Sequence, residues 1–252
     1  MEQISAIIIT QNEERNIGRC LESLAGVADE IIVVDSGSTD GTEAICRKAG
    51  VHFEHHDWEG YSGQKNYANS LATKPWILSI DADEALSPTL RESLLALKQQ
   101  GPEPNTIYFI NRLTNYCGHW IRHCGWYPDQ KCRLWPNGAV EWEGEVHEEL
   151  RHLQTHLVSA TLDGDLLHYS YYSVADHAAR QVRYATLAAK KAHAAGKKAS
   201  APAVWLRPGW TFFRNYIFKG GFLDGKAGYT VCRMSAFYTF IKYALLREYN
   251  KQ

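Results

Sequence analysis

Two aspartates follow directly on a strongly apolar segment of the chain. Asp81 and Asp83 come after Trp76–Ile80, which reads as a buried strand. Hard carboxylate oxygens suit Mg²⁺ or Mn²⁺, and Mg²⁺ keeps several waters, so one or two protein carboxylates suffice to hold it. Such an ion can neutralise the charge that grows on a departing diphosphate. The same pair can also be a helix cap or a solvated turn, and taken alone it does not distinguish these.

A further acid ends another apolar segment. Asp35 closes Glu30–Asp35 and is followed by Ser36-Gly37-Ser38, residue types that turn a chain sharply. Thr39 or Asp40 can then cap a helix. An acid at the end of a buried strand faces the ligand crevice and can accept hydrogen bonds from a uracil base or a ribose. The alternative is an ordinary strand-to-helix turn, but strand, acid, turn and cap in this order are more specific than Asp-x-Asp.

These acids belong to a regular alternation of predicted strands and helices. Strands are predicted over Ser5–Thr10, Glu30–Asp35, Val51–Glu54, Trp76–Ile80 and Thr106–Asn111, with helices following Asn12, Thr39, Gly63 and Ser87-Pro88. This alternation predicts βαβ units, and hence an α/β fold with a mostly parallel sheet flanked by helices. Because ligands bind at the carboxyl ends of such strands, we expect Thr10, Asp35 and the Asp81/Asp83 pair to come together.

Charge divides the chain of 252 residues into two parts. Residues 1–175 hold 13 Lys and Arg against 25 Asp and Glu, a net charge of −12, and residues 176–252 hold 14 against 3, a net charge of +11. With 45% hydrophobic and 22% charged residues the chain is not of the disordered class. A basic tail on an acidic body predicts an anionic partner, either a membrane surface or a nucleic acid.

Signals for cell compartment are few. No stretch reaches the roughly 18 apolar residues of a spanning helix, and Met1–Thr10 lacks the basic start and cleavage site of a secretory signal. The six cysteines are scattered without a CxxC pair, which fits a reducing compartment. We therefore expect a cytoplasmic protein.

The C-terminal part is predicted to be helical. Ser173 with Asp176 three residues later is typical of a capping box, and the helix should run to Gly196 before a linker over 197–203. Residues 204–247 interleave aromatic and basic side chains, as interfacial helices do at anionic membranes. The alternative is a helical pair whose aromatic residues pack on the domain. Both can hold at once, and we favour contact with a membrane surface.

The segments IIITQNEERNIGRCLESL, EIIVVDSGSTDGT, GQKNYA and WILSIDADE resemble the catalytic domain of family 2 glycosyltransferases, which has the Rossmann-like GT-A fold. The later segments KCRLWPNGAVEWEGEVHEEL and GGFLDGKAGY resemble bacterial lipopolysaccharide inner-core β-glucosyltransferases. The resemblance covers nearly the whole chain and is most specific over residues 4–84. It implies a GT-A domain over 1–172, with a donor half to about 111 and an acceptor half over 112–172, followed by a helical extension over 173–252.

The resemblance also implies roles for single residues. Thr10, Asn12 and Glu14 line the nucleoside pocket, Asp35 holds the base or ribose, and Lys65 approaches the nucleotide.

For the diphosphate end of the donor, Asp83 is the expected direct ligand of Mg²⁺ or Mn²⁺, and Asp81 contacts the ribose, the metal or a metal-bound water. Arg133 is expected at the diphosphate because an arginine fork suits phosphate, or else it is a surface charge on a strand. His52, His55 and His56 are interpreted as ordinary surface or core histidines.

The acceptor hydroxyl needs a general base, which the resemblance places near Glu145-Val146-His147-Glu148. Repulsion among the neighbouring glutamates can raise a carboxyl pKa toward neutrality. We take Glu148 as the candidate base, with His147 as the alternative base or a third metal ligand. A solvated acidic turn is the other interpretation of this segment.

Together these features predict an inverting glycosyltransferase at the inner face of the cytoplasmic membrane. It would move a hexose, expected to come from UDP-glucose, to a lipid-linked glycan such as the lipopolysaccharide inner core. One alternative is a nucleotidyltransferase, but TQNEERN after the first strand is acidic and lacks glycine. Another is a nucleic-acid-binding module built on the basic tail, which the acidic body disfavours.

Overall fold

The computed structural model describes residues 1–144 and 149–251, which form two compact units. The first comprises Met1–Arg112 and Asp129–His168, and the second comprises Leu113–Pro128 and Tyr169–Gln252. The second unit thus holds a piece of the expected acceptor half as well as the C-terminal helices. The boundary expected at residue 173 stays a prediction.

The first unit contains the predicted alternation of strands and helices. Its elements are β1 (Ile4–Thr10), α1 (Ile17–Leu24), β2 (Glu30–Asp35), α2 (Thr42–Ala49), β3 (His52–His55), α3 (Gly60–Leu71), β4 (Trp76–Asp81), β5 (Glu84–Leu86), α4 (Pro88–Gln100), β8 (Gln130–Pro136), β9 (Val140–Glu143) and β10 (Glu149–His152). Two longer strands, β6 (Thr106–Tyr116) and β11 (Val158–Tyr171), run from this unit into the second. The predicted α/β fold is confirmed.

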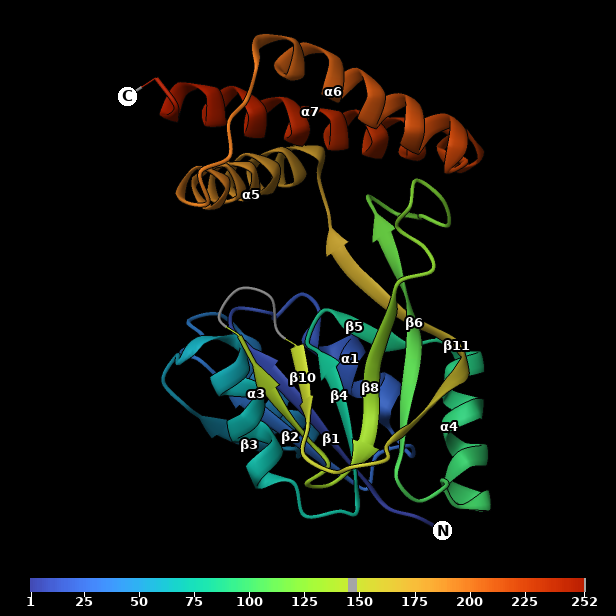
Figure 1. The fold of residues 1–252 in the computed structure, drawn as a ribbon. Coiled ribbons are helices and arrows are strands. Elements are labelled where there is room, and N and C mark those ends of the chain that lie inside the picture. The colour runs from blue at the N-terminus through green and yellow to red at the C-terminus, as the bar shows by residue number, and fades with distance from the viewer. Residues whose placement is uncertain (145–148, 252) are drawn as a thin grey trace. The chain divides into compact units, whose positions relative to one another are not determined.

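The main sheet is mixed. Its strand order is β3-β2-β1-β4-β8-β6-β11-β5, with β7 (His119–Trp120) paired to β6 (Figure 1). The pairs β2–β3, β1–β2 and β1–β4 are parallel, whereas β4–β8, β6–β8 and β5–β11 are antiparallel. The sheet is therefore parallel among β3, β2, β1 and β4, whereas β5 and β6, which flank α4, pair antiparallel with β11 and β8.

Alternate residues of the central strands pack in two separate hydrophobic cores. Ala6 and Ile8 of β1 pack in one cluster with Leu90 of α4, while Ile7 packs in the other with Ala68 of α3. All five are buried. Since successive side chains of a strand point to opposite faces, helices are required on both sides of β1. A shift of register by one residue would exchange the two faces, so this packing also fixes where the strands end.

The second unit is mainly helical, as predicted for the C-terminal extension. Its helices are α5 (Val174–Ala194), α6 (Ala201–Phe213), the π-turn η1 (Arg214–Phe218), the 3₁₀ turn η2 (Gly221–Asp224) and α7 (Gly225–Tyr249). The Ser173 hydroxyl accepts a hydrogen bond from the Asp176 backbone N–H, which confirms the predicted cap. The expected linker is shorter than predicted, because Pro202 opens the first turn of α6. Among the described helices, none is long and apolar enough to cross a membrane.

Candidate functional site

The carboxyl ends of three neighbouring strands bring the predicted polar residues together. In the parallel ladders, Thr10 at the end of β1 lies opposite Asp35 at the end of β2, and Ile9 lies opposite Asp81 at the end of β4. The sequence predicts that Thr10, Asp35 and Asp81 each lie at the end of a strand. The register now puts them at one edge of the sheet, where ligands of α/β folds bind.

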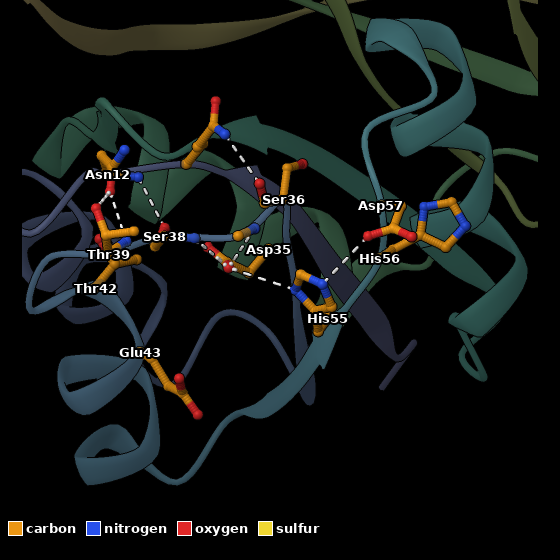
Figure 2. Close-up of polar contacts among 12 residues, drawn as sticks. Asn12, Asp35, Ser36, Ser38, Thr39, Thr42, Glu43, His55, His56 and Asp57 are labelled. Carbon is orange, nitrogen blue, oxygen red and sulfur yellow. Dashed lines mark hydrogen bonds and ion pairs between the residues drawn. The ribbon is translucent and has the colours of Figure 1, made fainter.

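Asp35 organises the turn between β2 and α2. Its Oδ2 accepts hydrogen bonds from the backbone N–H groups of Gly37 (2.9 Å) and Ser38 (2.8 Å), and its Oδ1 accepts one from the Ser38 hydroxyl (Figure 2). Gly37 has φ +83°, a left-handed conformation that favours glycine. The Asp35 side chain is buried, and its carboxylate holds the turn through these hydrogen bonds.

The segment after β1 is hydrogen-bonded to the same turn. The Asn12 backbone N–H donates to the Ser38 hydroxyl, and the Asn12 side-chain oxygen accepts from the Thr39 backbone N–H, both at 2.8 Å (Figure 2). Glu14 accepts a bond of 2.7 Å from the Gly41 N–H. Within the described residues, the buried hydroxyl of Thr10 has no hydrogen-bond partner. Asn12 and Glu14 therefore shape the turn, and their expected place in a nucleoside pocket stays a prediction.

His55 of β3 and Gln64 of α3 also contact residues of the β2–α2 turn. The His55 ring lies between two carboxylates, with Nδ1 3.9 Å from Asp35 and Nε2 3.5 Å from Asp57 (Figure 2). The buried Gln64 amide donates to the Ser36 hydroxyl at 2.8 Å and to the His56 carbonyl at 3.0 Å. His55 was interpreted as an ordinary histidine, but parallel pairing of β2 with β3 places it beside Asp35.

A buried charge network lies at the end of β4. Nη2 of Arg133 lies 2.7 Å from Oδ2 of Asp81 and 2.7 Å from Oε1 of Glu84, and the Arg133 side chain is only 4% exposed. Glu84, with no exposed side-chain surface, also accepts from the Asp81 backbone N–H at 3.0 Å. Nη1 of Arg112 approaches Glu84 to 3.8 Å. The expected contact of Arg133 with diphosphate stays a prediction, since here its guanidinium holds two carboxylates.

The network shifts the pKa of each acid. Burial acts to raise the pKa of the Asp81 carboxyl, but the charges of Arg133 and Lys65 outweigh it and hold that pKa well below its usual range. Burial raises the pKa of Glu84, and the negative charge of Asp81 adds to this effect. The network therefore favours the ionised form of Asp81 more strongly than that of Glu84.

Lys65 reaches the network from α3. Its ammonium lies 3.7 Å from Oδ1 of Asp81 and 4.4 Å from the ring centroid of Trp142, and its side chain is 8% exposed. A cation over an aromatic face is stabilised by the ring quadrupole. Lys65 and Asp81, both predicted to bind the donor, are thus brought together by the fold.

Asp83, the predicted metal ligand, has a partner that the sequence did not suggest. Its Oδ2 lies 3.2 Å from Nε2 of His168, which stands on β11 where that strand pairs with β5. Both side chains are partly buried. Within residues 1–144 and 149–251, no group of three or more His, Cys, Asp or Glu side chains could hold a metal ion. Asp83 and His168 thus bring one carboxylate and one imidazole into contact, and the expected role of Asp83 as a metal ligand stays a prediction.

The candidate bases His147 and Glu148 lie outside the described residues, so their placement is not part of this geometry. The segments on either side are described. Arg151 of β10 is hydrogen-bonded to Glu141 and lies 2.7 Å from Glu143 of β9. This cation offsets part of the like-charge repulsion that the cluster of glutamates was expected to produce.

The sequence did not single out Glu84 or His168 as members of this site, and it indicated only an ordinary histidine at His55. Glu84 follows the Asp-x-Asp pair directly, so its position was a usable signal once a buried strand was predicted there. No local motif marks His168, because its approach to Asp83 depends on antiparallel pairing of segments far apart in the chain.

Comparison with known proteins identifies relatives over the full chain. The family model of glycosyl transferase family 2 matches residues 5–135. An uncharacterised glycosyltransferase of Rickettsia bellii is 32% identical over 260 residues, covering 100% of this chain and 88% of the relative. The lipopolysaccharide core biosynthesis glycosyltransferase LpsC of Rhizobium meliloti is 32% identical over 257 residues, covering 97% of this chain and 92% of LpsC.

Solved structures match a smaller part of the chain. Glucosyl-3-phosphoglycerate synthase from Mycobacterium tuberculosis, in complex with Mn²⁺, UDP and glucosyl-3-phosphoglycerate, is 20% identical with a TM-score of 0.38, covering 45% of this chain and 44% of that one. TarS from S. aureus, in complex with UDP-GlcNAc, is 25% identical with a TM-score of 0.38, covering 45% and 35%. The matched part is thus less than half the length of either solved chain.

The charge network yields a stability prediction. Arg133→Met leaves the carboxylates of Asp81 and Glu84 without their shared guanidinium, and an uncompensated buried charge costs about 3–5 kcal/mol. We expect the free energy of unfolding, measured by chemical denaturation, to fall by about that amount. Arg151→Met is the matched control, because Arg151 is about half exposed and its loss should have little effect. Equal stability of the two variants would contradict a structural role for the network.

Proposed function

The chain belongs to glycosyl transferase family 2, and on that basis we propose that it is an inverting hexosyltransferase. The proposed donor is a nucleotide sugar, UDP-glucose, and the proposed acceptor is a lipid-linked glycan such as the lipopolysaccharide inner core. Similarity to LpsC over 97% of the chain supports the acceptor class. The single observation that carries the proposal is that the Asp35 turn, the Lys65–Asp81 pair and Asp83 gather at one edge of the sheet.

In this proposal the nucleoside binds over the ends of β1 and β2. Thr10, at the end of β1, lies opposite Asp35 in the parallel ladder and lines the nucleoside pocket in this proposal. Asp35 holds the base or the ribose from the rim, while Asn12 and Glu14 keep the turn in shape. Lys65, next to Asp81, faces the donor phosphates. Arg133 acts on the diphosphate side by holding Asp81 in position.

The residues at Asp83 fit a divalent cation. A carboxylate oxygen and an imidazole Nε2 lie 3.2 Å apart, so both can turn toward one ion, and diphosphate oxygens and waters can fill its remaining positions. An imidazole beside a carboxylate favours Mn²⁺ over Mg²⁺. A bound ion supplies charge stabilisation for the departing diphosphate. Asp83 and His168 would hold it, and Asp81, already paired with Arg133 and Lys65, would orient ribose or a coordinated water.

Transfer with inversion needs one base on the acceptor side. We assign this role to Glu148, with His147 as the alternative, and the base removes the proton of the acceptor hydroxyl as its oxygen attacks the anomeric carbon. The bond from that carbon to the diphosphate breaks in the same step, so one displacement inverts the configuration.

We further propose that the enzyme acts at the inner face of the cytoplasmic membrane, as a peripheral protein. Residues 176–252 carry a net charge of +11, and basic residues near an anionic membrane surface contribute about 1 kcal/mol each. A lipid-linked acceptor is anchored in the membrane, so association with the membrane surface brings the enzyme to it. Nucleic acid has no part in this proposal.

The metal assignment is tested at Asp83. Asp83→Ala should abolish sugar transfer and remove the Mn²⁺-dependent part of UDP binding, because one of the two protein ligands is lost. The measurement is calorimetric titration of UDP with Mn²⁺ and with EDTA, alongside a transfer assay. Asp163→Ala removes the same charge at an exposed position and should behave as wild type. Full activity of Asp83→Ala, or of the wild type in EDTA, would rule out a metal-assisted step.

The base assignment is tested by Glu148→Gln, which keeps the size of the side chain and loses the proton acceptor. Turnover should fall by about 10²–10⁴, the usual contribution of general-base catalysis, with donor affinity unchanged. Glu149→Gln, the same change one residue further on, is the control and should retain turnover. Near-normal turnover of Glu148→Gln would move the assignment to His147 or Glu145.

A further inference from the structure

Helix α6 and the turns after it expose an unusual number of large apolar side chains. Trp205 and Leu206 are each 71% exposed, Phe218 is 69% exposed, and Trp210 and Phe213 are also exposed. Three of these rings form one cluster, since the Trp210 centroid lies 6.1 Å from that of Phe213 and 6.1 Å from that of Phe218, and Phe213 lies 5.4 Å from Phe218. We call Trp205, Leu206, Trp210, Phe213 and Phe218 the α6 face.

The π-turn η1 extends this face by one turn. An α-helix advances about 100° per residue, so a residue five positions on lies well round the helix from the first. A π-turn is wider, with i→i+5 hydrogen bonds, which brings position i+5 closer to the side of the helix that position i occupies. Arg214–Phe218 forms such a turn, and the ring of Phe218 accordingly packs edge-on against Phe213. The irregular turn thus keeps Phe218 on the α6 face.

The other side of the same helix forms the core of the unit. Val204 is buried, and the ring of Phe212 stacks on Tyr216 at 5.2 Å and meets the edge of Tyr229 of α7 at 5.7 Å. Figure 1 shows α6 running along α7, and the two helices make extensive contact. Val204 and Phe212 anchor α6, and the ring of Trp205 also lies 5.9 Å from that of Phe240 of α7, whereas Trp210, Phe213 and Phe218 form their ring contacts with one another.

The charged residues in the segment that carries the α6 face are all basic. Residues 201–219 include Arg207, Arg214 and Lys219 and no acidic residue. Large apolar patches are rare on monomeric proteins and mark contacts with other molecules. Interfacial helices combine such aromatic and aliphatic faces with flanking cations, because rings settle at the depth of lipid headgroups while cations bind anionic lipid. The absence of acid in this segment and the +11 charge of 176–252 both favour an anionic surface.

We propose that the α6 face inserts into the boundary between headgroups and acyl chains of an anionic bilayer, with α6 lying in the plane of the surface. The inference deepens the peripheral association proposed above, and it rests on the proposed function only for the choice of membrane. It adds a hydrophobic component to what charge alone supplies. Binding should therefore have a salt-sensitive part from the cations and a salt-resistant part from the rings.

The test is co-sedimentation of the full chain with vesicles of phosphatidylglycerol and phosphatidylcholine. The variant Trp210→Ser/Phe213→Ser/Phe218→Ser should lower the partition coefficient by about tenfold or more, since it removes three apolar side chains from the contact. The matched control is Val182→Ser/Tyr184→Ser/Leu187→Ser, which alters three exposed apolar residues of α5 and should bind as wild type. Circular dichroism and UDP affinity, unchanged in both variants, separate this result from misfolding or from failure of the donor site.

Insertion itself is tested by fluorescence. Vesicles with brominated acyl chains should quench tryptophan emission of the bound wild type, and Trp205→Phe/Trp210→Phe should bind equally well yet lose most of the quenching. In about 1 M NaCl, where the Debye length is near 3 Å, part of the wild-type binding should persist. Complete release by salt, or equal binding of the α6 triple variant, overturns the proposal. It is also overturned if no vesicles bind and the α6 variant changes a self-associating protein into a monomer, because the face is then a protein interface.

Discussion

The guanidinium of Arg133 is shared by the two carboxylates that end and follow β4. It lies 2.7 Å from both Asp81 and Glu84, and it reaches them from β8, the first antiparallel neighbour of the parallel strands. Removing ions from water costs several kcal/mol each, which only close and well-oriented partners can offset. Because Glu84 has no exposed side-chain surface, its charge depends on this arrangement. The network therefore ties the parallel and antiparallel parts of the sheet together at the carboxyl end of β4.

This constraint gives the two aspartates of the Asp-x-Asp pair different surroundings. Asp81 is held by Arg133 and Lys65, and its depressed pKa keeps it ionised. Asp83 faces His168 instead, with a carboxylate oxygen and an imidazole nitrogen 3.2 Å apart. Asp81 is thus held by two cations, whereas Asp83 is paired with His168, a second possible metal ligand. In the proposed reaction, Asp81 orients the donor and Asp83 holds the ion at its diphosphate.

The parallel half of the fold was predictable because its signals are local. Unbroken apolar runs, followed by turn residues, marked the strands that end in Thr10, Asp35 and Asp81. The antiparallel half was not, since β11 mixes polar and apolar residues and pairs with β5 across a long stretch of chain. That pairing alone brings His168 to Asp83. Arg133 was recognised as a charge on a strand, but its burial depends on segments that only the folded sheet brings together.

The central claim is that the edge formed by β1, β2 and β4 binds the nucleotide of a sugar donor. The most direct measurement is calorimetric titration of UDP in the presence of Mn²⁺, for the wild type and for Asp35→Ala. We expect saturable binding to the wild type that weakens by about tenfold or more in the variant, because the variant loses a ligand contact and the anchor of the β2–α2 turn. Circular dichroism of the variant should remain that of a folded protein. Equal affinity of the two proteins, or no binding of UDP to the wild type, would contradict the claim.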